Sequence, residues 1–160
     1  MKRKPPATPP HRSYGPAADR ALKLWVSLAR CAASVGRASA RDIQRYGLTQ
    51  AQFAMLEVLY HKGPLPLCAI GEKLLVTSGN ITYVADQLER AGFLRRERSP
   101  EDRRVVLAHL RPKGRVLLAQ AFPLHAARIG ELARVLGPGE QKELARLLKK
   151  WGKAARASTE

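Results

Sequence analysis

The sequence predicts a mainly α-helical fold, a winged helix-turn-helix with a β-hairpin wing, flanked by long N- and C-terminal dimerisation helices. Three observations support this prediction. Apolar residues recur at helical spacing along most of the chain. A short helix and a longer polar-faced helix meet at a tight turn near the middle. Strand-forming residues with a charged turn follow that pair. The length of 160 residues suits one domain with helical extensions.

The N-terminal part divides into a tail and a long helix. Residues 1–16 hold five prolines and four basic residues, which predicts a disordered basic tail. Residues 17–46 contain no proline, and Gly47 suits a helix end. With residues 112–152 this helix is expected to form a dimerisation region. One face of the first helix carries Leu22, Trp25, Val26 and Ala29.

The central region, residues 47–111, is expected to bind DNA. Its first helix begins at a capping box, in which Thr49 and Gln52 satisfy each other's backbone N–H groups. Leu48 and Phe53 occupy the positions of a hydrophobic staple. The sequence Gly63–Pro64 ends this helix.

A helix-turn-helix follows the capped helix. Residues 67–74 predict a short helix, and Thr77 is a suitable N-cap for a helix over residues 77–91 that ends at Gly92. The apolar face of this second helix consists of Ile81, Val84, Ala85 and Leu88. Its opposite face is polar and nearly free of acid in its N-terminal half, with Thr77, Ser78, Asn80, Thr82, Tyr83, Asp86, Gln87 and Arg90.

Two strands and two further helices complete the prediction. A β-hairpin is predicted from the strand-forming residues 93–98 and 105–110, and the turn between these segments is its charged tip. Pro112 begins a helix that is expected to reach Leu136. A last helix passes Trp151, and residues 153–160 are expected to be a flexible C-terminus.

The charge of the chain narrows the class of partner. Twenty-nine basic and 13 acidic residues give a net charge of +16, which favours a polyanion, either nucleic acid or an anionic membrane surface. Most of the excess lies in residues 1–46 and 112–160, so charge does not locate the binding surface. No apolar run approaches the ~18 residues of a membrane span. We expect no membrane partner and a cytoplasmic, nucleoid-associated protein.

Enzymatic and metal-binding motifs are not recognisable. Cys31 and Cys68 lack metal-ligand spacing, and the four histidines pair with no evident cysteine or carboxylate in the sequence. No phosphate loop or nucleophile elbow is present. The sequence therefore predicts neither an enzyme nor a cofactor or metal site.

The polar helix and the hairpin tip predict how DNA would be bound. A helix fits the major groove, where Asn80 suits adenine and Tyr83 suits a phosphate or a thymine methyl group. Arg104 at the wing tip suits the minor groove, with Asp102 holding its guanidinium. The alternatives are an ordinary surface helix and a solvated turn. The predicted DNA-binding residues are Thr77, Ser78, Asn80, Thr82, Tyr83, Gln87, Asp102, Arg103 and Arg104.

A ligand cavity between the dimerisation and DNA-binding regions is a further hypothesis. Aromatic residues from both regions would line it, although each of them also suits a plain hydrophobic core. These residues are Trp25, Phe53, Tyr60, Phe122 and His125.

The chain resembles the MarR family of winged helix-turn-helix transcriptional regulators over residues 18–150. The strings that carry the resemblance are LTQAQF at 48–53, IGEKLLVTSGNIT at 70–82, LERAGFLRR at 88–96, SPEDRRV at 99–105 and PKGR at 112–115. Pro66 and Arg111 depart from the family pattern, which often has capping residues there. Cys31 lies too far along its helix to match the cysteine that senses oxidation in some members.

The resemblance implies a homodimeric repressor that binds a pseudo-palindromic operator in double-stranded DNA. It places the helix 77–91 in the major groove and matches Asp102 and Arg104 to the family's wing motif. It also implies release from DNA by a small lipophilic or phenolic ligand. Two alternatives stay open, a non-specific nucleic-acid-binding protein driven by charge and a helical scaffold that binds only protein.

Overall fold

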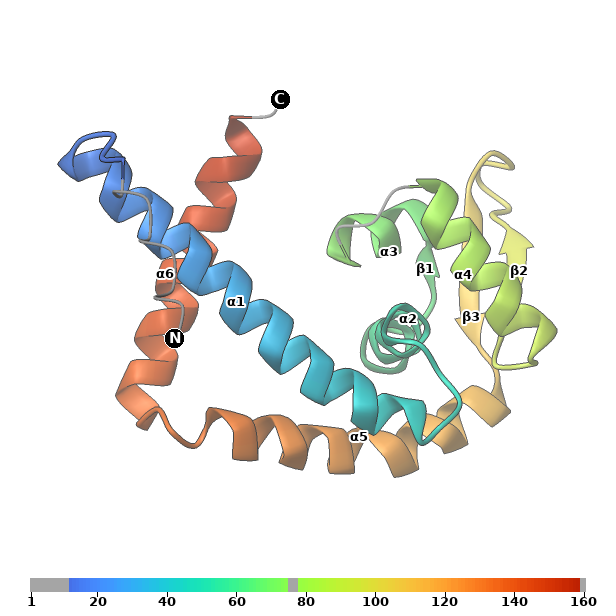
Figure 1. Ribbon diagram of the computed structural model, residues 1–160. Helices are drawn as coiled ribbons and strands as arrows, with labels where there is room; N and C mark the ends of the chain where they lie inside the picture. The colour runs from blue at the N-terminus through green and yellow to red at the C-terminus, as the bar shows by residue number, and fades with distance from the viewer. Residues whose placement is uncertain (1–11, 75–77, 159–160) are drawn as a thin grey trace, which may run out of the picture. The chain divides into compact units, whose positions relative to one another are not determined.

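The computed structural model describes residues 12–74 and 78–158 (Figure 1). The chain forms two compact units, residues 1–37 and residues 38–160. Helix α1, Pro16–Gln44, begins in the first unit and ends in the second. The described residues form a mainly helical fold with a small three-stranded antiparallel sheet, which confirms the predicted fold class.

The described part of the N-terminal unit consists of residues 12–15 and of helix α1 up to Arg37. Ser13 Oγ donates a hydrogen bond of 2.6 Å to Asp19 Oδ2, and the Tyr14 N–H donates one of 3.0 Å to Asp19 Oδ1. These bonds attach residues 13–15 to helix α1. Residues 13–15 are therefore ordered and do not belong to the disordered tail that was predicted for residues 1–16. Residues 1–11 of that tail lie outside the described residues.

The C-terminal unit is built around helix α2, Gln50–Lys62, which begins and ends as predicted. Gln52 N–H donates to Thr49 Oγ1, and Thr49 N–H donates to Gln52 Oε1, so the capping box is present. Gly63 ends the helix with a φ of 76°, a left-handed conformation that favours glycine. Leu48 and Phe53 are both buried in the core.

Helices α3, Leu67–Leu74, and α4, Ser78–Arg90, form the helix-turn-helix. The predicted N-cap Thr77 lies outside the described residues. After α4, the Phe93 N–H bonds the Leu88 carbonyl and the Gly92 N–H bonds the Glu89 carbonyl, with a φ of 77° at Gly92. This is a Schellman motif, as the glycine predicted. The apolar face of α4 is buried, with Ile81, Val84, Ala85 and Leu88.

The sheet contains the predicted hairpin and one strand that was not predicted. Strands β2, Leu94–Arg98, and β3, Val106–Leu110, pair antiparallel, and Figure 1 shows α4 beside them. Strand β1, Leu65–Pro66, pairs with the other edge of β3. Two residues are too few to show the alternating pattern of a strand, and proline is disfavoured in strands except at edges. Strand β1 could therefore not be predicted from the sequence.

Helices α5, Pro112–Ala133, and α6, Pro138–Ala157, differ from their predicted ends. Helix α5 stops at Ala133 rather than at Leu136, because residues 134–136 form a turn. Helix α6 continues past residue 152, so the flexible C-terminus predicted from residue 153 is wrong up to Ala157. The physical reason is that its residues 153–157, Lys-Ala-Ala-Arg-Ala, all have high helix propensity.

The core of the C-terminal unit lies between α2 and the elements around it, α3, α4, α5 and β3. Burying such large apolar side chains stabilises a fold by roughly 1.5–3 kcal/mol each. The largest of the fully buried side chains belong to Phe53, Met55, Leu56, Leu59, Ile70, Leu88, Leu94 and Leu118. Among the described residues, no helix is both long and apolar enough to span a lipid bilayer.

Candidate nucleic-acid interface

Helix α4 exposes a polar ridge on the side opposite its buried face. Asn80 and Thr82 are exposed, and the Tyr83 side chain is 61% exposed. Ser78 is the first residue of the helix, and its side chain is not described. The first turn of α4 contains no acidic residue, so neither its dipole nor its surface repels an anion.

Gln87 was predicted to contact DNA, but its side-chain amide is bonded to two other side chains of the protein. Its Oε1 accepts a hydrogen bond of 2.9 Å from Gln52 Nε2, and its Nε2 donates one of 2.7 Å to the Tyr83 hydroxyl. Gln52 was not among the predicted site residues. The spacing of Tyr83 and Gln87, four positions apart on α4, was the available signal for their contact. No linear signal points to Gln52, which lies 35 positions from Gln87.

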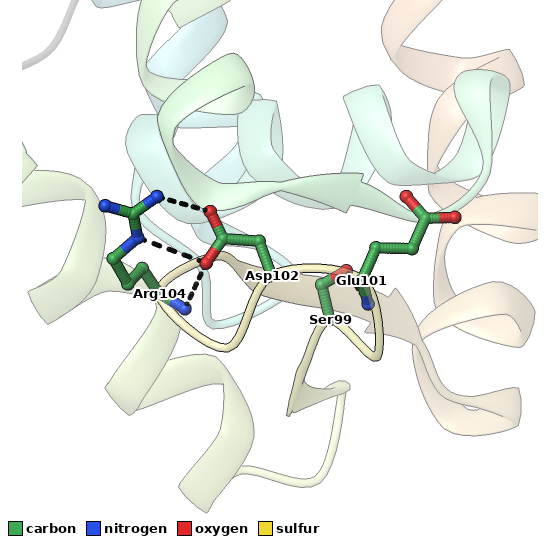
Figure 2. Close-up of polar contacts among 4 residues, drawn as sticks. All are labelled: Ser99, Glu101, Asp102 and Arg104. Carbon is green, nitrogen blue, oxygen red and sulfur yellow. Dashed lines mark hydrogen bonds and ion pairs between the residues drawn. The ribbon is translucent and has the colours of Figure 1, made fainter.

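The tip of the wing carries a fixed carboxylate–guanidinium pair, shown in Figure 2. Asp102 Oδ1 accepts from the backbone N–H of Arg104 at 2.9 Å and from its Nε at 3.2 Å, and Asp102 Oδ2 accepts from a terminal guanidinium nitrogen at 3.2 Å. The side chain of Arg104 is 92% exposed despite these bonds. Hydrogen bonds from the side chain and then the backbone of Arg104 lower the pKa of Asp102. The Asp102 carboxylate thus holds the exposed guanidinium of Arg104 in one orientation.

The wing turn is closed by its own backbone. The Ser99 N–H bonds the Val105 carbonyl at 2.8 Å, and the Val105 N–H bonds the Asp102 carbonyl at 2.9 Å. The Glu101 N–H also donates a hydrogen bond of 3.3 Å to Ser99 Oγ. Arg103 lies within this turn and is exposed. The predicted wing residues Asp102, Arg103 and Arg104 therefore share one compact tip.

A salt-bridge cluster joins α4 to the wing. Glu89 Oε1 accepts from the Arg96 backbone N–H at 2.6 Å, and Glu89 Oε2 accepts from Arg96 Nε at 2.9 Å. Asp86 Oδ1 lies 2.5 Å from a terminal nitrogen of Arg96. Burial disfavours the charge of Arg96, but Glu89 and then Asp86 outweigh it, so the pKa of Arg96 is raised. This connection between α4 and the wing was not predicted from the sequence.

Two histidines lie beside carboxylates, a proximity that the sequence did not indicate. His109 Nε2 on β3 lies 2.7 Å from Glu97 Oε1 on β2. His125 Nδ1 on α5 lies 3.8 Å from Asp42 Oδ2 near the end of α1, and both side chains are largely buried. These partners are distant in sequence, which is why spacing did not reveal them. Within residues 12–74 and 78–158, no three His, Cys, Asp or Glu side chains cluster as a metal site would require.

The structure brings together four of the five predicted ligand-cavity residues in two groups. The rings of Phe53 and His125 lie 4.9 Å apart. His61, which was not predicted, lies 4.5 Å from the Phe122 ring and 5.2 Å from the Tyr60 ring. Trp25 belongs to the N-terminal unit and is exposed.

A cavity of about 210 Å³ lies elsewhere in the C-terminal unit, beside the start of α4. Its lining contains none of the predicted ligand-cavity residues. The lining residues are Gln50, Ala51, Ala54, Leu74, Asn80, Ile81 and Val84.

A helix-turn-helix with a polar second helix, followed by a hairpin bearing an exposed arginine, defines the class of winged helix-turn-helix proteins. The sequence model of the MarR family matches residues 48–106. Two relatives from Bacillus subtilis match most of this chain. The HTH-type transcriptional regulator YkoM is 48% identical over 84% of this chain and 87% of its own. The HTH-type transcriptional regulator MhqR is 44% identical over 84% and 92%.

The chain therefore belongs to the MarR family and is a helix-turn-helix transcriptional regulator. A solved relative supports the fold. Sco3205, a MarR family transcriptional regulator from Streptomyces coelicolor solved in complex with DNA, superposes with a TM-score of 0.78. It is 22% identical and covers 84% of this chain and 90% of its own.

Proposed function

We propose that this regulator is a homodimeric repressor that binds a pseudo-palindromic operator in double-stranded DNA. The observation that carries the proposal is the connection of the polar ridge of α4 to the Arg104-bearing wing through Glu89 and Arg96. Two DNA-contacting elements held at one angle suit adjacent grooves of one duplex. Membership of the MarR family and the DNA complex of Sco3205 support the same function.

Each predicted DNA-binding residue has a role in this proposal. Asn80 reads a base edge in the major groove, and Thr82 and Tyr83 contact phosphate or a thymine methyl group. Thr77 and Ser78 are proposed to let the backbone approach DNA, because both have short side chains. Gln87 acts by positioning Tyr83. Arg104 enters the minor groove, aided by Asp102 and flanked by Arg103.

The flanking helices, residues 17–46 and 112–152, form the homodimer interface in this proposal. Helix α6 buries no side chain completely, and apolar residues on both α1 and α6 remain exposed in the single chain. A second copy would cover such apolar faces, and twofold symmetry suits an operator with two half-sites. The exposed apolar residues are Leu22, Leu24, Trp25, Val26 and Val35 on α1, and Leu144, Leu147 and Leu148 on α6.

A selection of binding sites from a random duplex library tests this function. We expect enrichment of an inverted repeat with half-sites about one helical turn apart, bound by two chains. A gel-shift titration of the selected site against scrambled duplexes then measures specificity. Equal affinity for every duplex would reject the proposal.

A non-specific nucleic-acid-binding protein is the second candidate, favoured by the net charge of +16. In that case affinity would fall steeply with salt and show no preferred site. The ridge of α4 argues against it, because a coating protein gains most from lysine and arginine there. Comparing selected and scrambled duplexes over a salt series separates the two functions.

A small lipophilic or phenolic ligand that releases the DNA is a further part of the proposal. The aromatic residues Phe53, Tyr60, Phe122 and His125 of the C-terminal unit would receive it. Such a ligand should raise the melting temperature of the free protein and weaken DNA binding together, because the two equilibria are linked. A compound that stabilises the protein without changing DNA affinity would contradict the coupling.

A further inference from the structure

We propose that the Tyr83 hydroxyl is a preset hydrogen-bond donor to DNA, and that Gln52 and Gln87 are the residues that set it. This inference rests on the proposed function. A chain of hydrogen bonds runs from the start of α2 to the exposed ridge of α4. We call it the Tyr83 relay, and it consists of Thr49, Gln52, Gln87 and Tyr83.

The polarity of the Tyr83 relay begins at a backbone group. The Thr49 N–H can only donate, so the atom of Gln52 that lies 2.9 Å from it must be the acceptor Oε1. The other end of that amide is then the donor Nε2. It lies 2.9 Å from Gln87, which must therefore present its own acceptor Oε1. Turning either amide over would bring two donors together.

The same reasoning determines the state of Tyr83. With Oε1 of Gln87 facing Gln52, its Nε2 faces the Tyr83 hydroxyl at 2.7 Å and donates to it. A phenol has one proton, and an oxygen that accepts from Gln87 must direct that proton elsewhere. The Tyr83 side chain is 61% exposed, so the proton is available to an acceptor outside the protein.

The chemistry that matches such a donor is a hydrogen-bond acceptor of DNA, either a phosphate oxygen or an acceptor on a base edge. The relay orients the hydroxyl before DNA arrives, which reduces the ordering entropy lost on binding. Gln52 connects this orientation to the N-terminus of α2, because it also completes the capping box there.

The substitution Gln52→Glu tests the relay because it reverses polarity while it preserves the capping box. A glutamate also accepts from the Thr49 N–H, as capping boxes commonly do. Its second oxygen faces Gln87, however, and only accepts. Gln87 would then donate toward residue 52 and accept from Tyr83, so the phenolic proton would point inward. The matched control is Gln50→Glu, which adds the same charge to the same helical turn.

Full-length variants are titrated against the selected operator. We expect Tyr83→Phe and Gln52→Glu each to weaken binding about tenfold, and Gln50→Glu to change it much less. The double variant should bind no more weakly than either single variant, because both changes remove one donor. The proposal would be overturned if Tyr83→Phe bound the operator as tightly as wild type, or if Gln52→Glu bound it as tightly as Gln50→Glu. Additive losses in the double variant would also overturn it.

The source of the acceptor is identified with modified operators. Replacing the contacted phosphate by a neutral methylphosphonate should abolish the difference between wild type and Tyr83→Phe if the acceptor is a phosphate. A 7-deazapurine at the contacted base should abolish it if the acceptor is a purine N7. If wild type and Tyr83→Phe still differ in affinity in both series, Tyr83 donates to neither of these acceptors.

A measurement without DNA separates this inference from the proposed function. The nuclear Overhauser effects between the side-chain amide protons of Gln87 and the ring protons of Tyr83 report the direction of the relay, because Gln87 Nε2 faces the phenol in the proposed arrangement. We expect these effects in wild type and their loss in Gln52→Glu, in which the amide of Gln87 is turned over. Unchanged effects in Gln52→Glu would refute the relay even if the operator is bound. A wild-type chain that selects no operator would refute the DNA function, while the amide protons of Gln87 still decide the polarity.

Discussion

The two carboxylate oxygens of Glu89 each accept a hydrogen bond from Arg96, one from its backbone N–H and one from Nε. Because one of the donors is backbone, the bond fixes the path of strand β2 as well as the direction of a side chain. Helix α4 and the wing therefore keep one relative orientation within the C-terminal unit.

Replacing Glu89 by alanine should weaken both folding and operator binding. The change leaves Arg96 without its main partner, and we expect a loss of about 1 kcal/mol in the free energy of unfolding. Operator affinity should fall further, because the wing loses its orientation. Urea denaturation and gel shift measure the two effects. The control is Glu143→Ala, which removes a short but exposed ion pair between Glu143 and Arg146 on α6. Equal effects of Glu89→Ala and Glu143→Ala would contradict the prediction.

The bond between Asp102 and Arg104 should make wing binding insensitive to pH between about 5 and 8. A carboxylate with a lowered pKa contributes above its unfolded pKa and loses that contribution as the pH falls through the lower folded value. Asp102→Ala should thus weaken operator binding by a constant factor over this range, whereas Glu101→Ala should not. The affinity ratio of wild type to Asp102→Ala, followed against pH, checks this, and a ratio that changes between pH 8 and 5 would contradict it.

Asn80 and Arg104 should differ in what their loss does to specificity. Asn80→Ala should cost about 1–3 kcal/mol at one base pair and relax the preference there. Arg104→Ala should weaken binding to most sequences and reduce the salt dependence. Repeating the site selection with each variant compares the two. Identical selected motifs for wild type and Asn80→Ala would mean that Asn80 reads no base.

Gly114 should tolerate no side chain at the junction of the wing and α5. A Cβ there would lie 2.4 Å from the Phe93 carbonyl oxygen and 2.8 Å from Leu110 Cδ1. We expect Gly114→Ala to lower stability by about 1–3 kcal/mol. Gly130, in the same helix, has open space at that position, and Gly130→Ala should raise stability by up to about 1 kcal/mol. Thermal unfolding of both variants decides, and equal melting temperatures would contradict the account.

A charge on the apolar face of α6 should disrupt the proposed homodimer. Leu147→Glu places a carboxylate among leucines that a second copy is proposed to cover. We expect a monomer that binds a full operator much more weakly. Lys149 is exposed and lies on the side of α6 opposite these leucines, so Lys149→Glu, which places a carboxylate outside the apolar face, is the control. Light scattering coupled to size exclusion gives the molar mass, and an unchanged mass for Leu147→Glu would remove α6 from the interface.

Much of the architecture was predictable because its causes are local. The capping box of Thr49 and Gln52, the glycine that ends α4 and the apolar spacing on α4 depend on neighbours within a few residues. The bond between Asp102 and Arg104 also lies within one turn, so its geometry followed from spacing. That these residues contact DNA stays a prediction.

The sequence by itself determined which face of α4 is buried, where the helix-turn-helix and hairpin lie, and that Asn80, Thr82 and Tyr83 are exposed. Only the tertiary structure decided that strand β1 completes the sheet, that Glu89 binds Arg96 and that Gln52 bonds Gln87. The physical reason is range. Periodicity and capping report interactions between residues a few positions apart, whereas these contacts form only after the apolar faces have packed and brought distant polar groups together.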